Sequence, residues 1–166
     1  MYRALHFVGL LIISWCVMTF THEMGHIIGG WCSGAILKDA DLLPWHLPYS
    51  IFEPEPRPLV TLWSGPFLGV AIPLSVAWLV RTNRTWFIAN FGTIANGAYL
   101  ATAWISNEPF LDTPKLLEHG ASPMTVLLYC IVTIGIGYLG FRRSCYSVLT
   151  TGSVQQREIN AEFPKP

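Results

Sequence analysis

Long apolar stretches alternate with short polar segments along this chain. Three of these stretches carry no formal charge: Leu59 to Val80 and Gly120 to Phe141 over 22 residues each, and Thr85 to Asn107 over 23. A helix that crosses the hydrocarbon core of a bilayer needs about 20 predominantly apolar residues, so each stretch is long enough to cross. The pattern predicts membrane spans at about 59–80, 85–106 and 122–141.

An earlier apolar stretch is longer than a single crossing requires. The 34 residues between Arg3 and Lys38 include one formal charge, Glu23. At about 1.5 Å per residue, a helix of this length must tilt, break near Gly29-Gly30 or continue beyond the membrane. A cleaved signal peptide is the alternative, but no small-x-small cleavage site precedes residue 22, so we expect an uncleaved span over about 4–31.

The segments between the spans differ in character. Residues 33–58 are rich in proline and contain Trp45, Tyr49 and Phe52. Because aromatic rings favour the headgroup boundary, we expect an interfacial or re-entrant segment there. Between the last two spans, a short helix is expected to begin at Pro114, with Thr113 as its cap and Gly120 as its stop.

These elements predict an all-α membrane protein with about four transmembrane helices, divided into a helical domain at 1–141 and a polar C-terminal tail at 142–166. Composition agrees, since charged residues make up 12% of the chain, against about 25% in ordinary soluble domains. The formal net charge is zero, so nothing indicates a nucleic-acid partner. The four cysteines have no paired metal-ligand spacing. We therefore expect an integral, multi-pass protein whose surroundings are the lipid bilayer.

The first span contains the sequence His22-Glu23-Met24-Gly25-His26, an HExxH pattern. Residues four apart share one face of a helix, so both imidazoles can bind one Zn²⁺ ion. Glu23 lies beside His22, where its carboxylate can accept a proton from water that zinc has acidified to a pKa of about 7. The pattern predicts His22 and His26 as metal ligands and Glu23 as the catalytic base of a hydrolase.

A purely structural interpretation of this segment is a polar cluster packed between helices, with both histidines hydrogen-bonded to backbone carbonyl groups. Ionisable residues inside a membrane span are costly and by default mark a functional site. Here three of them, His22, Glu23 and His26, lie within five residues. The functional interpretation is therefore favoured.

A catalytic zinc site usually has three protein ligands and one open position. Two crossings separate the end of the first span from the end of the third, so both ends face the same side of the membrane. Asp112 follows the third span and is flanked by apolar residues, which makes it the expected third ligand. Glu108 is its main rival. The other carboxylates on that side lie in the proline-rich segment or near the end of the short helix: Asp39, Asp41, Glu53, Glu55 and Glu118.

With HExxH on an early span and a later Leu111-Asp112 pair, the chain resembles the site-2 protease family of intramembrane zinc metalloproteases. The second motif of that family reads roughly NxxPxPxLDGGHxL, and Pro109, Leu111, Asp112 and Leu117 match it. Ser64-Gly65-Pro66 is similar to a Gly-Pro in a family span. The resemblance implies cleavage of transmembrane protein or peptide substrates, with Asp112 as the third zinc ligand.

The chain also departs from the family pattern. Thr113-Pro114 replaces the Gly-Gly after the aspartate, and Trp104 replaces the asparagine associated with the reacting carbonyl. Asn96 and Asn107 are possible substitutes for that asparagine. These departures favour an alternative, a non-proteolytic zinc-binding membrane protein that acts through partner binding. Glu23 speaks against it, because a structural zinc site needs no base. A metal-ion transporter is a more distant alternative, since no internal repeat is visible.

Charge gives an expectation for orientation that disagrees with the resemblance. Arg81, Arg84, Arg142 and Arg143 fall on the side of Arg3, and the positive-inside rule places that side in the cytoplasm. The metal site would then face away from the cytoplasm, whereas the family resemblance implies that it lies nearer the cytoplasmic face. The sequence leaves the side of the active site, the substrate and the oligomeric state open.

Overall fold

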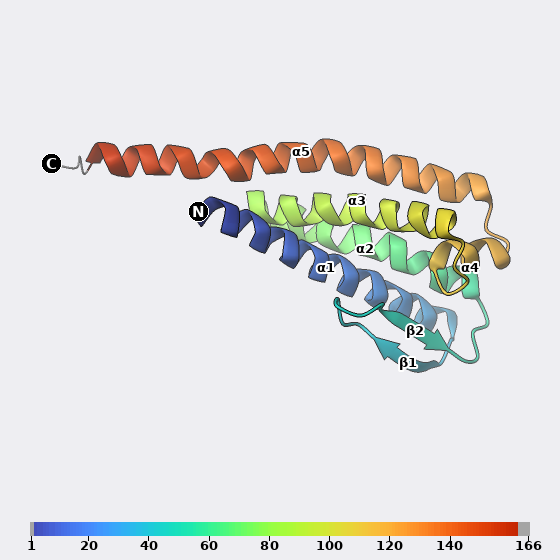
Figure 1. Ribbon diagram of the computed structural model, residues 1–166. Helices are drawn as coiled ribbons and strands as arrows, with labels where there is room; N and C mark the ends of the chain where they lie inside the picture. The colour runs from blue at the N-terminus through green and yellow to red at the C-terminus, as the bar shows by residue number, and fades with distance from the viewer. Residues whose placement is uncertain (1, 163–166) are drawn as a thin grey trace.

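The chain forms a bundle of long helices with a small β-hairpin at one flank (Figure 1). The computed structural model describes the backbone of residues 2–162 and the side chains of residues 4–150. A two-stranded antiparallel hairpin follows the first helix, and a short helix lies between the last two long ones. The elements are α1 (Tyr2–Ser33), β1 (Leu37–Asp41), β2 (Tyr49–Phe52), α2 (Pro58–Val80), α3 (Asn83–Ser106), α4 (Asp112–Glu118) and α5 (Pro123–Glu162).

Three helices, α1, α2 and α5, are long and apolar enough to cross a membrane. This confirms the predominantly helical membrane-protein class in its coarse form. α3 has 24 residues but is less apolar, because it carries Asn90 and Asn96 within its length. Asn90 donates to the hydroxyl of Ser144 on α5, and Asn96 is fully buried against α1. The polar side chains of α3 are therefore turned toward neighbouring helices.

α3 lies between α5 on one side and the α1–α2 pair on the other (Figure 1). α1 and α2 approach closely because Gly25 and Gly29 face Ser64, where any added Cβ would meet atoms of α2. Small residues at such contacts are typical of helix packing in membranes. At the same end of the bundle, Leu62, Leu100, Leu116, Val126 and Cys130 form a buried apolar cluster that joins α2, α3, α4 and α5.

The helix bounds follow local chemistry. α1 continues unbroken through Gly29-Gly30 to Ser33, although a break was one of the expected possibilities. Between α2 and α3, Arg81 adopts a left-handed conformation (φ 57°), and Thr82 forms a reciprocal capping box with Thr85. Two residues therefore complete the turn.

The predicted cap of the short helix is wrong. α4 begins at Asp112, and Thr113 lies inside its first turn instead of preceding it. The hydroxyl of Thr113 donates to the backbone oxygen of Leu100 at 2.7 Å, which ties α4 to α3. Gly120 follows the helix with φ 90°, a conformation that glycine adopts at little cost, as expected of a stop.

The segment expected to be interfacial or re-entrant contains a hairpin, so the secondary structure is not purely helical. Asp41 pairs with Tyr49 and Asp39 with Ile51, and the register shifts between Asp39 and Leu37. The ring of Phe52 packs over Gly30 of α1, where a Cβ would collide with it. Across the turn, Trp15 of α1 donates its indole N–H to the backbone oxygen of Pro44 at 2.9 Å. The hairpin is thus fastened along α1 at both ends.

α5 continues past Phe141, the expected end of the fourth span, and reaches Glu162. The residues assigned to a polar tail from 142 begin as a direct extension of the same helix. The division into domains at 1–141 and 142–166 remains a prediction.

Candidate metal centre

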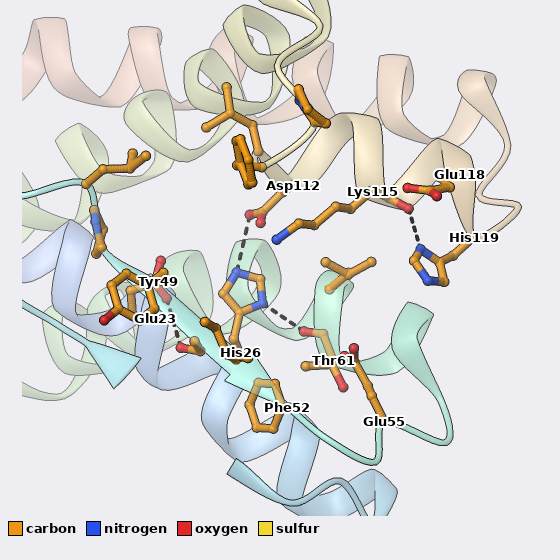
Figure 2. A pocket seen from close by; sticks show the side chains of 18 of the residues that line it. Glu23, His26, Tyr49, Phe52, Glu55, Thr61, Asp112, Lys115, Glu118 and His119 are labelled. Carbon is orange, nitrogen blue, oxygen red and sulfur yellow. Dashed lines mark hydrogen bonds and ion pairs between the residues drawn. The ribbon is translucent and has the colours of Figure 1, made fainter. Parts of the chain in front are cut away.

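The two histidines of the HExxH pattern face a carboxylate that lies far from them in the sequence. His22 and His26 lie one turn apart on α1, and their Nε2 atoms are 3.1 Å from each other. One oxygen of Asp112, Oδ2, lies 2.8 Å from Nε2 of His22 and 3.2 Å from Nε2 of His26. All three residues are buried. Figure 2 shows Asp112 descending from the start of α4 onto His26.

The outer nitrogen of each imidazole is held by an acceptor. Nδ1 of His22 donates to Oδ1 of Asn96 at 2.7 Å, and Nδ1 of His26 donates to the backbone oxygen of Thr61 at 2.9 Å. The Asn96 amide has only this orientation available, because its Nδ2 donates to the backbone oxygen of Gly92 at 2.8 Å. Hydrogen bonds of this kind fix the proton on Nδ1 and leave the Nε2 lone pair free for a metal.

The donor atoms fit a zinc ion. Two Nε2 atoms and one carboxylate oxygen converge within 3.2 Å, and three such atoms can lie this close only if protons or a metal cation lie among them. Tetrahedral zinc with bonds of about 2.0–2.1 Å requires ligand atoms about 3.3 Å apart. The observed separations of 2.8–3.2 Å approach that value. Two imidazoles and one carboxylate are also a usual ligand set for catalytic zinc.

Backbone and packing features make this convergence possible. Gly65 on α2 lies against the imidazole of His26, and a Cβ at this position would occupy the space of that ring. The bond from Thr113 to Leu100 fixes the first turn of α4, and so the carboxylate of Asp112, over α3. Burial opposes ionisation of Asp112, but the facing imidazoles of His26 and His22 outweigh it and hold the pKa of this carboxyl well below its usual range. Asp112 is therefore an anion that faces both imidazoles.

Glu23 lies beside the centre without joining the contacts of Asp112 with the two imidazoles. A carboxylate oxygen of Glu23 and a ring nitrogen of each histidine lie within 4.8 Å of one another. The hydroxyl of Ser50 on β2 donates to Oε2 of Glu23 at 3.0 Å, so the hairpin orients this carboxylate. The Glu23 carboxylate thus lies near the candidate ligands and is held by Ser50. The general base of a metal-assisted hydrolase has the same placement.

The centre opens into a pocket of about 530 Å³. Glu23, His26 and Asp112 form its inner wall together with Tyr99, whose ring meets His22 edge-on at 5.2 Å between centroids. The hairpin and α4 form opposite sides of the opening (Figure 2). Much of the remaining lining is apolar, from Leu47, Pro48, Ile51, Phe52, Leu62, Pro109, Phe110 and Leu111. The pocket can receive an apolar chain beside the candidate metal ligands.

The rival carboxylate of Glu108, the amide of Asn107 and two further histidines lie outside the centre. Glu108, the rival of Asp112, is exposed in the loop before α4. His46 contacts Asp41 at 2.9 Å within the hairpin turn, and His119 donates to the backbone oxygen of Lys115 at the pocket rim. Asn107 ends α3 in a left-handed conformation. Neither His46 nor His119 contacts a metal-ligand candidate.

Sequence reasoning missed several participants. Asn96 was considered only as a substitute for the asparagine of the resembled family, whereas it holds the imidazole of His22. Its signal was a carboxamide in an otherwise apolar helix. Thr61, Tyr99 and Ser50 carried no signal, because their contacts depend on packing between segments far apart in the chain.

Comparisons of the chain with protein-family models, curated proteins and solved structures found no match. Function must therefore be inferred from the geometry of the centre itself.

Proposed function

We propose that this protein is an intramembrane zinc metalloprotease, in which His22, His26 and Asp112 hold Zn²⁺ and Glu23 is the catalytic base. One observation carries the proposal: Asp112, ninety residues from His22 in sequence, brings a carboxylate oxygen within 3.2 Å of both Nε2 atoms. Three ligands leave a fourth position for water, as hydrolysis requires.

Zinc held by these ligands would supply Lewis acidity, which makes water acidic enough to lose a proton near neutral pH. The Glu23 carboxylate accepts that proton and delivers it to the nitrogen of the leaving amine. The hydrogen bond from Ser50 keeps the carboxylate of Glu23 beside the ligands during both steps. Attack on the substrate carbonyl places negative charge on its oxygen, which needs a hydrogen-bond donor.

Tyr99 is the donor we assign to that oxygen. The resembled family has an asparagine for this task, and the matching residue here, Trp104, packs against the apolar cluster away from the pocket. Tyr99 forms part of the pocket wall with Glu23 and Asp112, and its hydroxyl faces the backbone amide of Asp112. A phenol O–H in this place can donate to the carbonyl oxygen as charge develops there.

The surroundings of the centre favour a membrane-embedded peptide substrate. α1 carries His22 and His26 and is apolar enough to cross the bilayer. We further propose that α3 crosses beside α1, α2 and α5, giving four spans, and that the hairpin is an interfacial or re-entrant element. The apolar lining of the pocket suits a substrate taken from a transmembrane segment.

The decisive experiment compares wild type with Glu23→Gln in purified protein. Elemental analysis should find about one zinc per chain in both proteins, and His22→Ala combined with His26→Ala should lose it. Cleavage of a transmembrane peptide should occur with wild type and disappear with Glu23→Gln, since glutamine keeps the shape but accepts no proton. Equal cleavage by the two proteins would refute the role of Glu23.

The same experiment decides in favour of the alternative if wild type binds zinc and cleaves nothing. That alternative is a non-proteolytic zinc-binding membrane protein that acts through a partner. It is favoured by Trp104 in place of the family asparagine and by Thr113-Pro114 in place of Gly-Gly. Glu23, buried and held at the pocket wall, favours the protease.

A further inference from the structure

A second hollow lies far from the metal centre, between the starts of α1 and α3. Its volume is about 540 Å³. The walls are apolar and come from Leu5, Leu10, Ile13 and Ile88, while His6 and Arg84 contribute polar side chains. Gly9 is also part of the lining, and a Cβ added there would meet nothing within 4 Å. The hollow is therefore a groove kept open by the absence of a side chain at position 9.

Polarity changes along the length of this groove. His6 and Arg84 lie toward the outer end, because both are near the first turns of their helices. Ile13 lies two turns deeper on α1, about 10 Å further along the helix axis. The groove thus offers a guanidinium and an imidazole at one end and an apolar channel leading inward, which is the polarity of a phospholipid from headgroup to acyl chain.

The charge around the outer end is of one sign. Phe141 packs against Phe87 and Phe91, with ring centroids 4.9 and 5.9 Å apart, so Arg142 and Arg143 lie at the level of the start of α3. Among the described side chains, no carboxylate lies within 4 Å of Arg81, Arg84, Arg142 or Arg143. All acidic residues from 4 to 150 belong to the metal-centre end of α1, to the hairpin segment or to the α3–α5 connection. The guanidinium groups at this end are therefore open to an anion from outside the chain.

We propose that this groove binds an anionic phospholipid, with the phosphate at Arg84 and His6 and one acyl chain over Gly9 between α1 and α3. Arg84 is the better anchor, because a guanidinium binds phosphate through two parallel hydrogen bonds. The acyl chain covers Leu5, Leu10 and Ile13, which would otherwise line an unfilled gap in the bilayer. The site is independent of the proposed protease activity.

The test uses the full chain in detergent micelles and measures retained phosphatidylglycerol by native mass spectrometry, with phosphatidylcholine as the neutral lipid. Arg84→Gln removes the phosphate anchor, and Gly9→Phe fills the channel at a position where the fold has room. Arg142→Gln is the matched control for lost charge outside the groove. Gly135→Phe is the matched control for an added ring, since Gly135 is exposed on α5 and a Cβ there also meets nothing within 4 Å.

Wild type should retain phosphatidylglycerol in preference to phosphatidylcholine. Arg84→Gln should lower retention about fivefold, the effect of one basic residue near a membrane surface. Gly9→Phe should lower it at least as much, while both controls stay near wild type. Equal retention of the two lipids, or losses in Arg142→Gln as large as in Arg84→Gln, would show attraction by surface charge alone. Wild-type retention of phosphatidylglycerol by Gly9→Phe would likewise show that the groove is not the binding site.

Discussion

Asn96 is fully buried on α3, and its amide joins two helices: Oδ1 accepts from His22 on α1, while Nδ2 donates within α3 to Gly92. Gly69 of α2 backs the amide so closely that a Cβ there would meet it. One side chain is thus fixed on three sides, and through it the imidazole of His22 is fixed as well. Asn96 is a positioning residue of the centre.

Replacing Asn96 should weaken zinc binding. Asn96→Leu removes the acceptor and leaves a buried Nδ1–H of His22 unpaired, so zinc affinity should fall by about 10–100-fold, as is typical for partners of a metal-ligating histidine. Asn96→Asp keeps an acceptor and should preserve affinity. Competition with a chelator measures both. Asn90→Leu, at an α3 amide bonded to Ser144, is the matched control, and an unchanged affinity in Asn96→Leu would contradict the role of this amide.

The hydroxyl of Tyr99 should matter to cleavage and not to zinc. Tyr99→Phe keeps the ring against His22 and removes one oxygen, so kcat/KM should fall by about 10²–10³-fold, the loss typical of one donor to a developing oxyanion. Zinc affinity should match wild type, and a phosphinic peptide that imitates the tetrahedral state should bind more weakly. Tyr129→Phe is the control, because its hydroxyl donates to Pro66 outside the pocket lining. Wild-type rates and phosphinate affinity in Tyr99→Phe would exclude this donor.

The residue pattern predicted the part of the site that lies within one helix. His22, Glu23 and His26 occupy neighbouring positions on α1, and their spacing alone indicates a shared face. Asp112 required a further argument about which ends of the spans meet. Asn96, Thr61 and Tyr99 meet the histidines only through the packing of α2 and α3 on α1, and no spacing in the sequence records that packing.

Between elements, the contact of α1 with α2 decides how much space the centre has. Gly25 and Gly29 on α1 and Gly65 on α2 leave room where side chains would otherwise separate the helices. At Gly65 the space is filled by the imidazole of His26, which can then reach the backbone oxygen of Thr61. The helix contact therefore sets the position of a metal-ligand candidate.

A methyl group at Gly65 should disturb the centre through this contact. Gly65→Ala places a Cβ in the space of the His26 ring, and overpacking of this kind costs about 1–3 kcal/mol. Zinc affinity should fall by about tenfold or more, measured by chelator competition. Gly135→Ala, on the exposed face of α5, should bind zinc as wild type does. Wild-type affinity in Gly65→Ala would mean that the ring can move without losing the ion.

The bounds of a helix could be predicted from the sequence where the helix ends at the same residue as an apolar stretch. The bounds of α2 and α3 follow apolar stretches that end in the polar turn at 81–84. The hairpin was missed because its strands have only five and four residues, and Leu37–Asp41 is mostly polar. The polarity of residues 142–162 indicated a tail, yet the arginine, glutamine and glutamate among them are also good helix formers that allow α5 to continue.

For the whole molecule, the separation of charge gives a preferred orientation. The arginines at the α2–α3 turn and at the level of Phe141 lie at one end, and the acidic residues from 4 to 150 lie elsewhere. The positive-inside rule places the arginine end in the cytoplasm and the metal centre toward the opposite face. The family resemblance implies the reverse, so orientation needs a direct measurement.

A single cysteine at Asn83 tests this orientation in a chain whose four native cysteines are replaced by alanine. Asn83 is exposed in the turn between α2 and α3. From the charges, we expect it to resist a membrane-impermeant maleimide in intact cells and to react after the membrane is opened. A cysteine at Glu108, exposed near the other end, should behave in the opposite way. Labelling of position 83 from outside would exclude the charge-based topology.

Asp112 comes from α4, and the acceptor for His22 comes from α3. The centre can therefore form only late in the synthesis of the chain. During synthesis, α1 enters the bilayer with its two imidazoles and Glu23 before any of these partners exists. Asn96 is costly in hydrocarbon until it meets α1, which favours insertion of α2 and α3 together as a helical hairpin. The nascent chain therefore has no complete set of the three candidate ligands until it has been made past residue 112, so the proposed activity cannot arise while the earlier helices are being inserted.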